Sequence, residues 1–302
     1  MRIRQSFWSS LLHSERKEVI PSPLRWPAWA YAPIAAVFMV LLAVGSTTFA
    51  GSATWLANPA TAHWNAAANW TAGGPPNGPS DTATFDVSTI TRVFIAVDTE
   101  VNGIVFNAGA SAFTIAARSA RTLTISGTGI TNNSGLEQRF VANSLGTILF
   151  TGDSTGDRAR VQLVDSSSLD ISSHNPPGVT VGSIEGTGTV ILGANNLTVD
   201  TNYHNTVFSG VIQDSGAGGS LTKLGRRTLT LGNANTYSGG TTISDGVLSV
   251  GNQTGSATGP GAVDVAAGIL AGDGTIAGPV TIGTGSEGGP TAVLQPGEEG
   301  VL

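Results

Sequence analysis

Residues 221–252 read LTKLGRRTLTLGNANTYSGGTTISDGVLSVGN, and this stretch decides the fold. It contains three short runs, 229–231, 241–243 and 247–250, in which apolar side chains occupy every second position. Alternation with a period of two is typical of β-strands, and no run is long enough to form a stable helix. Glycine, asparagine or aspartate closes each run, and these residues favour tight turns. The stretch therefore predicts short strands that turn at regular intervals and bury their apolar faces by stacking on similar units.

The same residues resemble the autotransporter-associated β-strand repeat, also called the passenger-associated transport repeat. Its pattern is G-x-L-x-K-x-G-x-G-x-L-x-L-x-x-x-N-x-Y-x-G-x-T-x-I-x-x-G-x-L-x-V, and Arg227 stands where the pattern has glycine. A second, weaker match covers residues 186–212. The resemblance implies a right-handed parallel β-helix in the passenger of an exported bacterial protein, and it implies no particular reaction. The clearest repeat spans 219–252, and its motif residues, which we expect to be structural, are Gly219, Leu221, Lys223, Gly225, Leu229, Leu231, Asn235, Tyr237, Gly239, Thr241, Ile243, Gly246, Leu248 and Val250.

The composition fits an all-β chain with many turns. Glycine supplies 41 of the 302 residues and charged residues only 11 %, whereas globular domains average about 7 % glycine and about 25 % charged residues. Cysteine is absent, which excludes disulfides, thiolate nucleophiles and cysteine-bound zinc. Turn signals recur about every ten residues from 111 to 302, and a parallel β-helix has three such segments in each coil. We take consecutive coils to be spaced about 20 to 25 residues apart in the sequence. This spacing predicts ten to twelve coils, counted over all residues after the leader.

The first fifty residues differ from the rest of the chain. Several arginines precede an apolar run at 34–45 and a stretch of small residues that ends at Ala50. An apolar run of about 12 residues is shorter than a membrane span of about 20 and fits a signal peptide. We therefore expect residues 1–50 to be a signal peptide, with an uncleaved N-terminal anchor as the alternative. Removing its 5 basic and 2 acidic residues from the totals of 14 and 20 leaves 9 basic and 18 acidic, a charge that disfavours nucleic acid as a partner.

Residues 51–110 form a tryptophan-rich cap segment. Trp55, Trp64 and Trp70 lie among small polar residues, before a cluster of proline and glycine that interrupts regular structure. Exported proteins of the repeat family often begin with a similar segment. We expect the rings to plug the open end of the solenoid core, because an exposed end leaves an unpaired edge. The alternative is a row of tryptophans that stack on sugar rings, which would make this segment a carbohydrate-binding module.

The C-terminal residues 293–302 resemble the family's L-x-P-G-x-x-G-x-L turn, which normally leads into a further strand. We therefore expect a chain that is truncated at its C-terminus. We also expect the outer-membrane translocator domain of such proteins to be absent from residues 1–302. The expected location is exported, at the cell surface or outer membrane or outside the cell, after contact with the export machinery at the membrane.

The catalytic motifs in the sequence lack the required context. Residues 152–156 fit the G-x-S-x-G pattern, and Asp165, His174 and His204 follow in the order of a hydrolase triad. That motif works on a turn between a strand and a helix, whereas predicted strands flank it here. The four histidines are scattered along the chain without metal-ligand spacing. The sequence therefore predicts no catalytic residue, no metal site and no cofactor.

Charged residues are concentrated at one place in the middle of the chain. The group either forms a solvated loop whose charges neutralise each other or binds calcium or an acidic sugar through carboxylates and arginines. Its members are Asp153, Asp157, Arg158 and Arg160.

The most favoured function is a non-catalytic surface or secreted passenger stalk that contacts surface glycans or extracellular matrix. The alternative is a polysaccharide lyase or hydrolase built on the same coil. Its candidate acidic residues are Asp153, Asp157, Asp165 and Asp170.

Overall fold

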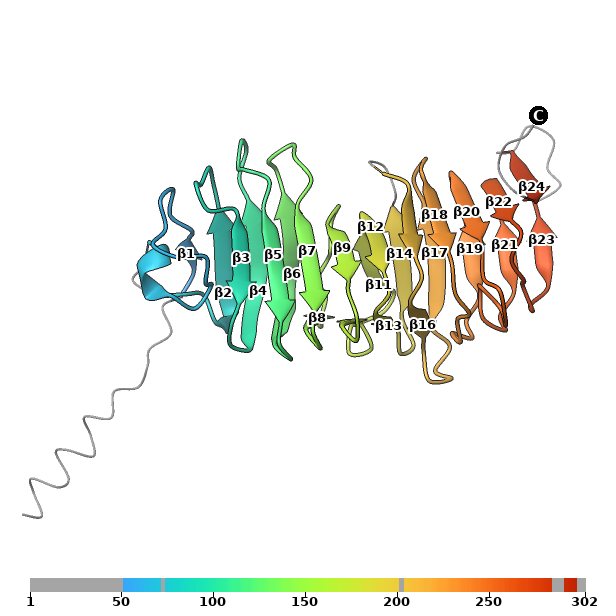
Figure 1. Ribbon diagram of the computed structural model, residues 1–302, viewed down its shortest axis with the longest axis horizontal. Coiled ribbons are helices and arrows are strands. Elements are labelled where there is room, and N and C mark those ends of the chain that lie inside the picture. Colours follow the sequence, from blue (N-terminus) through green and yellow to red (C-terminus); the bar gives the residue numbers. More distant parts are fainter. Residues whose placement is uncertain (1–50, 72–73, 201–203, 284–290, 298–302) are drawn as a thin grey trace, which may run out of the picture. The chain divides into compact units, whose positions relative to one another are not determined.

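The computed structural model describes residues 51–71, 74–200, 204–283 and 291–297 (Figure 1). The predicted signal peptide lies outside the described residues, as does the end of the predicted C-terminal turn. The described chain is an all-β parallel solenoid, which confirms the predicted fold class. Its described helical structure is one 3-10 turn, η2 (Ala67–Asn69), in the tryptophan-rich segment.

Two sheets run along most of the solenoid. Within each sheet, neighbouring strands pair in parallel. The first sheet orders β1 (Ala53–Thr54), β2 (Gly78–Phe85), β4 (Thr99–Phe106), β6 (Thr122–Asn132), β8 (Thr147–Phe150), β10 (Ser168–Asp170), β13 (Thr189–Ile191) and β16 (Val211–Gln213). The second sheet orders β3 (Arg92–Ile95), β5 (Thr114–Arg118), β7 (Arg139–Asn143), β9 (Arg160–Leu163), β12 (Ser183–Gly186), β15 (Thr206–Phe208), β18 (Thr228–Leu231), β20 (Val247–Val250), β22 (Gly268–Gly272) and β24 (Ala292–Pro296).

A third sheet joins in the second half of the chain. It orders β11 (Gly178–Val181), β14 (Asn196–Asp200), β17 (Ser220–Leu224), β19 (Thr241–Ile243), β21 (Val263–Val265) and β23 (Val280–Ile282). Successive strands of one sheet are separated in sequence by strands of the other sheets, as expected when the chain winds in coils. Figure 1 shows the resulting order, with neighbouring strands following each other from β1 to β24.

The second sheet contributes one strand to each coil, so its ten strands count ten coils. This number agrees with the predicted ten to twelve. The coils differ in length, because Ile115 pairs with Phe140 after 25 residues whereas Leu229 pairs with Leu248 after 19. The difference lies in the turns, since the strands keep their register.

The core consists of columns of apolar side chains that run from coil to coil. Leu229, Leu248 and Leu270 occupy consecutive paired positions of the second sheet and are almost completely buried. Each strand directs every second residue inward, so an in-register pairing places one inward residue on the next. Full burial of one leucine stabilises the fold by about 1.5–3 kcal/mol. The columns are therefore the main source of stability, repeated at every coil.

Aromatic rings fill the N-terminal end of the core. Phe85 lies with its ring centroid 5.2 Å from that of Phe106 and 4.9 Å from that of Phe113. The Trp70 ring contacts Phe85 at 5.7 Å, edge to face. Rings at these separations stabilise a pair beyond their buried area. The first coils thus contain the three buried tryptophans and a cluster of phenylalanines, whereas later coils carry single buried rings such as Phe208 and Tyr237 among aliphatic side chains.

A buried carboxylate joins two consecutive coils. Asp214 follows β16 and accepts hydrogen bonds from the backbone amides of Gly216, Gly218 and Gly219 at 2.8–3.0 Å. It also accepts bonds from the amide and the hydroxyl of Ser238, one coil further on, at 2.8 and 2.6 Å. Burial alone would raise the pKa of Asp214, but the bonds from Ser238 and the glycines outweigh it and lower the pKa to about 2.

We predict that Asp214→Asn destabilises the fold by about 2 kcal/mol at pH 7, because each unit of pKa depression corresponds to about 1.4 kcal/mol. The carboxylate stabilises the fold fully above its unfolded pKa near 3.8, and this contribution is lost as the pH falls through about 2. Urea unfolding of the full chain between pH 7 and pH 2 measures this effect. Asp264→Asn, at an exposed strand position, is the matched control. A difference between Asp214→Asn and wild type that stays constant with pH would contradict the assignment.

Candidate functional site

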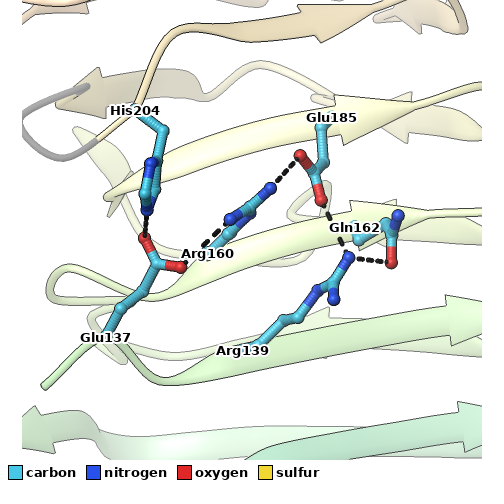
Figure 2. Close-up of polar contacts among 6 residues, drawn as sticks. All are labelled: Glu137, Arg139, Arg160, Gln162, Glu185 and His204. Carbon is cyan, nitrogen blue, oxygen red and sulfur yellow. Dashed lines mark hydrogen bonds and ion pairs between the residues drawn. The ribbon is translucent and has the colours of Figure 1, made fainter. Parts of the chain in front are cut away.

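Six polar side chains form a network on the outer face of the second sheet (Figure 2). Strand register brings them together: Arg139 of β7 pairs with Arg160 of β9, and Gln162 of β9 pairs with Glu185 of β12. These positions alternate with buried core residues, so their side chains point outward. The members of this network are Glu137, Arg139, Arg160, Gln162, Glu185 and His204.

Arg160 lies at the centre of the network. Its Nη2 is 2.6 Å from Glu185 Oε2 and its Nη1 is 3.2 Å from Glu137 Oε1. Arg139 Nη2 contacts Glu185 Oε1 at 3.2 Å and Gln162 Oε1 at 2.6 Å. His204 Nε2 lies 3.2 Å from Glu137 Oε2 and extends the network to a further coil. The network therefore links side chains that are up to 67 residues apart in the sequence, between positions 137 and 204.

The electrostatics of the network favour charge pairing. The hydrogen bond with Glu185 raises the pKa of Arg160 above its ordinary value, against an opposing effect of burial, and Glu137 adds to the increase. Both glutamates are held by guanidinium groups. The Nε atoms of Arg139 and Arg160 are buried without a hydrogen-bond partner. Because these Nε atoms are buried, only the Nη groups of the two guanidinium groups could meet an anionic group from outside the network.

The three tryptophans of the predicted cap are buried. Trp55, Trp64 and Trp70 are 1 %, 1 % and 3 % exposed, and they contact each other edge to face. Their indole nitrogens donate to backbone carbonyls, Trp55 to Ile90 and Trp64 to Pro76. No described ring of these three offers a face to a sugar, so the glycan-stacking alternative has no surface to use. The burial fits the cap interpretation, in which the rings plug the end of the core.

The serine of the G-x-S-x-G pattern is a turn residue. Ser154 is 1 % exposed, and its hydroxyl donates to the carbonyl of Thr151 at 2.8 Å. His174 does lie beside it, but its Nε2 contacts the backbone oxygen of Ser154 at 2.7 Å rather than the hydroxyl. Asp165 and His204 lie elsewhere. The side chains are therefore not arranged as a nucleophile and its base.

The predicted charge group does not form one site. Asp153 accepts from the amide side chain of Asn175 at 3.0 Å, and Asp157 accepts from the backbone of Asn132 at 2.8 Å. Asp170 likewise caps a turn by accepting from the backbone of Ser172. Only Arg160 of this group enters the network on the second sheet. No cluster of three or more potential metal ligands occurs in the part of the chain that the structure describes.

Sequence reasoning named His204 only as a member of the possible triad, and it missed four members of the network: Glu137, Arg139, Gln162 and Glu185. Arg139 and Arg160 are 21 residues apart, one coil length, so an alignment of coils could have placed them side by side. Such an alignment is difficult because the turn lengths vary. Within the described ranges no helix has the length and apolar character of a membrane span.

Comparison with protein families gives a match within residues 221–252, the stretch that predicted the short strands. Residues 221–250 match the family model described as Passenger-associated-transport-repeat. The chain carries a passenger-associated transport repeat. Searches of curated proteins and of solved structures gave no match. The repeat covers β17 to β20, which lie in the third and second sheets in register with their neighbours.

Two polar residues of the passenger-associated transport repeat replace strand hydrogen bonds where the first sheet ends. Asn235 accepts from the amide of Ile212 at 2.6 Å and donates to the carbonyl of Ala257 at 2.5 Å, so it bridges the coils before and after its own. Tyr237 is fully buried, and its hydroxyl contacts that of Thr241 at 2.6 Å. These bonds explain why the repeat carries polar residues at positions that face the core.

The lysine of the passenger-associated transport repeat occupies a core column. Lys223 is 0 % exposed and lies in register between Val199 and Ile243 of the third sheet. Its ammonium group donates to the carbonyls of Leu224 and Gly225 at 2.9 and 2.6 Å. A third bond reaches the carbonyl of Asp245 at 3.2 Å. Burial lowers the pKa of Lys223 to about 8, although the charges of Asp245 and Asp200 oppose the shift.

We predict that the wild type gains stability relative to Lys223→Met as the pH rises from about 7 to 10.5, by up to about 3 kcal/mol. The unfolded lysine holds its proton up to its ordinary pKa of 10.5, whereas the folded one releases it from about 8, so the cost of burying the charge disappears across this window. Urea unfolding of both chains at several pH values measures the difference. Arg226→Gln, at an exposed neighbouring position, is the control. Parallel pH profiles for wild type and Lys223→Met would show that the lysine is not buried as described.

Proposed function

We propose that this chain is a non-catalytic passenger stalk, exported to the cell surface or beyond, which contacts surface glycans or extracellular matrix. The observation that carries the proposal is the passenger-associated transport repeat at 221–250, which lies within an unbroken stack of parallel coils. Each coil contacts mainly its neighbours, so adding coils extends the stack without changing the fold. Such a structure serves to hold exposed turns away from the surface to which it is attached.

The polar residues support the same proposal. Asp153, Asp157, Asp170 and Ser154, which sequence patterns relate to catalysis, are bonded within turns or to neighbouring coils. Their hydrogen bonds satisfy backbone and side-chain groups of the solenoid. Asp153 and Asp157 thus help to join neighbouring coils, which is the requirement of a stalk, and Ser154 and Asp170 stabilise their own turns.

We predict that an epitope inserted between Ala108 and Gly109 is labelled by antibody on intact cells of the organism that encodes the chain, or is found in the medium. These residues form an exposed turn between β4 and β5, and a side chain at Gly109 would meet nothing within 4 Å. Insertions at exposed turns are tolerated best. An epitope on a cytoplasmic protein is the control for cell integrity. Labelling that requires lysis of the cells would overturn the export part of the proposal.

A second candidate function is a polysaccharide lyase or hydrolase. Glu137 and Glu185 favour it, because they lie on one outer face of the solenoid and acidic residues act as general acids and bases in glycan cleavage. Their pairing with Arg160 and Arg139 favours a binding role instead. We expect the full chain to release neither reducing ends nor unsaturated products from plant and microbial polysaccharides. Release that is abolished by Glu185→Gln would favour the enzyme.

A further inference from the structure

A second group of side chains lies on the same outer face of the second sheet, nearer the N-terminus. Phe94 of β3 carries two guanidinium groups against its ring: the Cζ of Arg118 is 3.9 Å from the ring centroid and that of Arg92 is 5.4 Å away. The backbone of His63, in the preceding coil, forms a parallel β-bridge with that of Phe94. The centroid of the imidazole ring lies 6.1 Å from that of the phenyl ring. Cation–π contact holds the arginines in place without using their hydrogen-bond donors.

The donors of this pair remain open for a ligand. Among the described residues, neither Arg92 nor Arg118 has a hydrogen-bond acceptor or a carboxylate partner, and both side chains reach solvent. A hollow of about 230 Å³ opens beside Arg118, lined by Ile95, Ala96, Ser119 and Arg121 as well. Arg121 lies at the rim and contacts Asp98 only at 4.0 Å. Planar guanidinium groups with free N–H donors match the geometry of carboxylate and sulfate oxygens.

Positive charge is concentrated on this face. Nine basic residues follow residue 50 in the sequence, and four of them are on the outer side of β3, β5, β7 and β9. They are Arg92, Arg118, Arg139 and Arg160. Only Glu137 and Glu185 oppose them in the network of Figure 2, whereas the chain after residue 50 carries twice as many acidic as basic residues. The face is therefore a strip of arginines on a negative protein, in which Arg92 and Arg118 carry positive charge without a described carboxylate partner and the charges of the network are balanced by its two glutamates.

We propose that this strip, here named the arginine face and defined by Arg92, Arg118, Arg139 and Arg160, binds the carboxylate or sulfate groups of an acidic polysaccharide. The inference deepens the proposed contact with glycans and rests on it for its biological setting. Arg92 and Arg118 supply the open donors, and Arg139 and Arg160, whose charges are paired with Glu185 and Glu137, continue the line of guanidinium groups along the sheet.

The spacing of the arginines fits a polymer that lies along the stack. The four arginines come from four consecutive strands of the second sheet, and neighbouring strands are about 4.8 Å apart. Arg92, Arg139 and Arg160 share one column of paired positions, in which β5 contributes Thr114, and Arg118 lies four residues further along β5. An extended chain with a charge at intervals would meet one guanidinium after another. The acidic remainder of the protein repels a polyanion as densely charged as DNA at long range, which favours the sparser charge of a polysaccharide. The rings of Phe94 and His63 add apolar surface against which sugar faces can lie.

The test uses the purified full chain and two probes, polygalacturonate for carboxylates and chondroitin sulfate for sulfates, with dextran as the neutral polymer. We expect the wild type to bind at least one acidic probe and not to bind dextran. The double variant Arg92→Gln and Arg118→Gln should lose affinity for that probe by about tenfold or more, because the charge-assisted bonds of both arginines are removed. The double variant Arg226→Gln and Arg227→Gln removes the same charge from another turn and is expected to bind within about twofold of wild type. Circular dichroism confirms that both variants fold.

Several outcomes would overturn the inference. Equal loss of affinity in the two double variants would show attraction to net charge alone. Absence of binding to both acidic polysaccharides, or binding only to vesicles that contain phosphatidylglycerol, would show that acidic polysaccharide is not the ligand. Failure of the intact-cell labelling, by contrast, would remove the surface role and leave the binding result unchanged, so the two proposals can fail separately.

Discussion

The structure depends on the parallel register between consecutive coils. Each inward side chain must lie on an inward side chain of the next coil, as Leu229 lies beside Leu248, because a shift by one residue would turn every core position toward solvent. Every strand of the second and third sheets obeys this constraint, although the turns between them differ in length. The largest polar side chains of the core have hydrogen-bond partners, as Tyr237 has in Thr241. Lys223 has such partners because carbonyl groups of its own corner and of the next coil surround its ammonium group.

The same register makes the outer surface a composite of distant segments. Arg139, Arg160 and Glu185 belong to three coils, yet both arginines contact Glu185 within 3.2 Å because β7, β9 and β12 are consecutive strands of one sheet. A binding surface on a solenoid therefore does not require a dedicated loop. It is produced by side chains at equivalent positions of successive coils. The charge of this surface changes along the stack, because β3, β5, β7 and β9 carry arginines and the strands of the second sheet after β12 carry none.

The sequence predicted the local structure well and the surface poorly, for a physical reason. Alternation in residues 229–231 and 247–250 reports which side chains face inward, and these strands and their glycine-closed turns are present. The position of one coil against the next depends on the turn lengths, which the alternation does not encode, so Arg92, Arg118 and Arg139 could not be recognised as neighbours. Alternation does place Lys223 on the inward face with Leu221, but a lysine is normally assigned to solvent. Its backbone partners become visible only in the fold.

The unequal distribution of aromatic residues gives the solenoid a direction. Trp55, Trp64, Trp70 and Phe85 contact one another in the first coils, so the largest buried side chains are concentrated at one end. In a stack whose coils contact only their neighbours, order begins where a few coils are stable together and then spreads to the next coil. At the aromatic end a few coils bury the tryptophans Trp55 and Trp64, which are among the largest fully buried side chains. Assembly of the native structure is therefore expected to nucleate there and to proceed toward the C-terminus, each finished coil serving as the template for the following one.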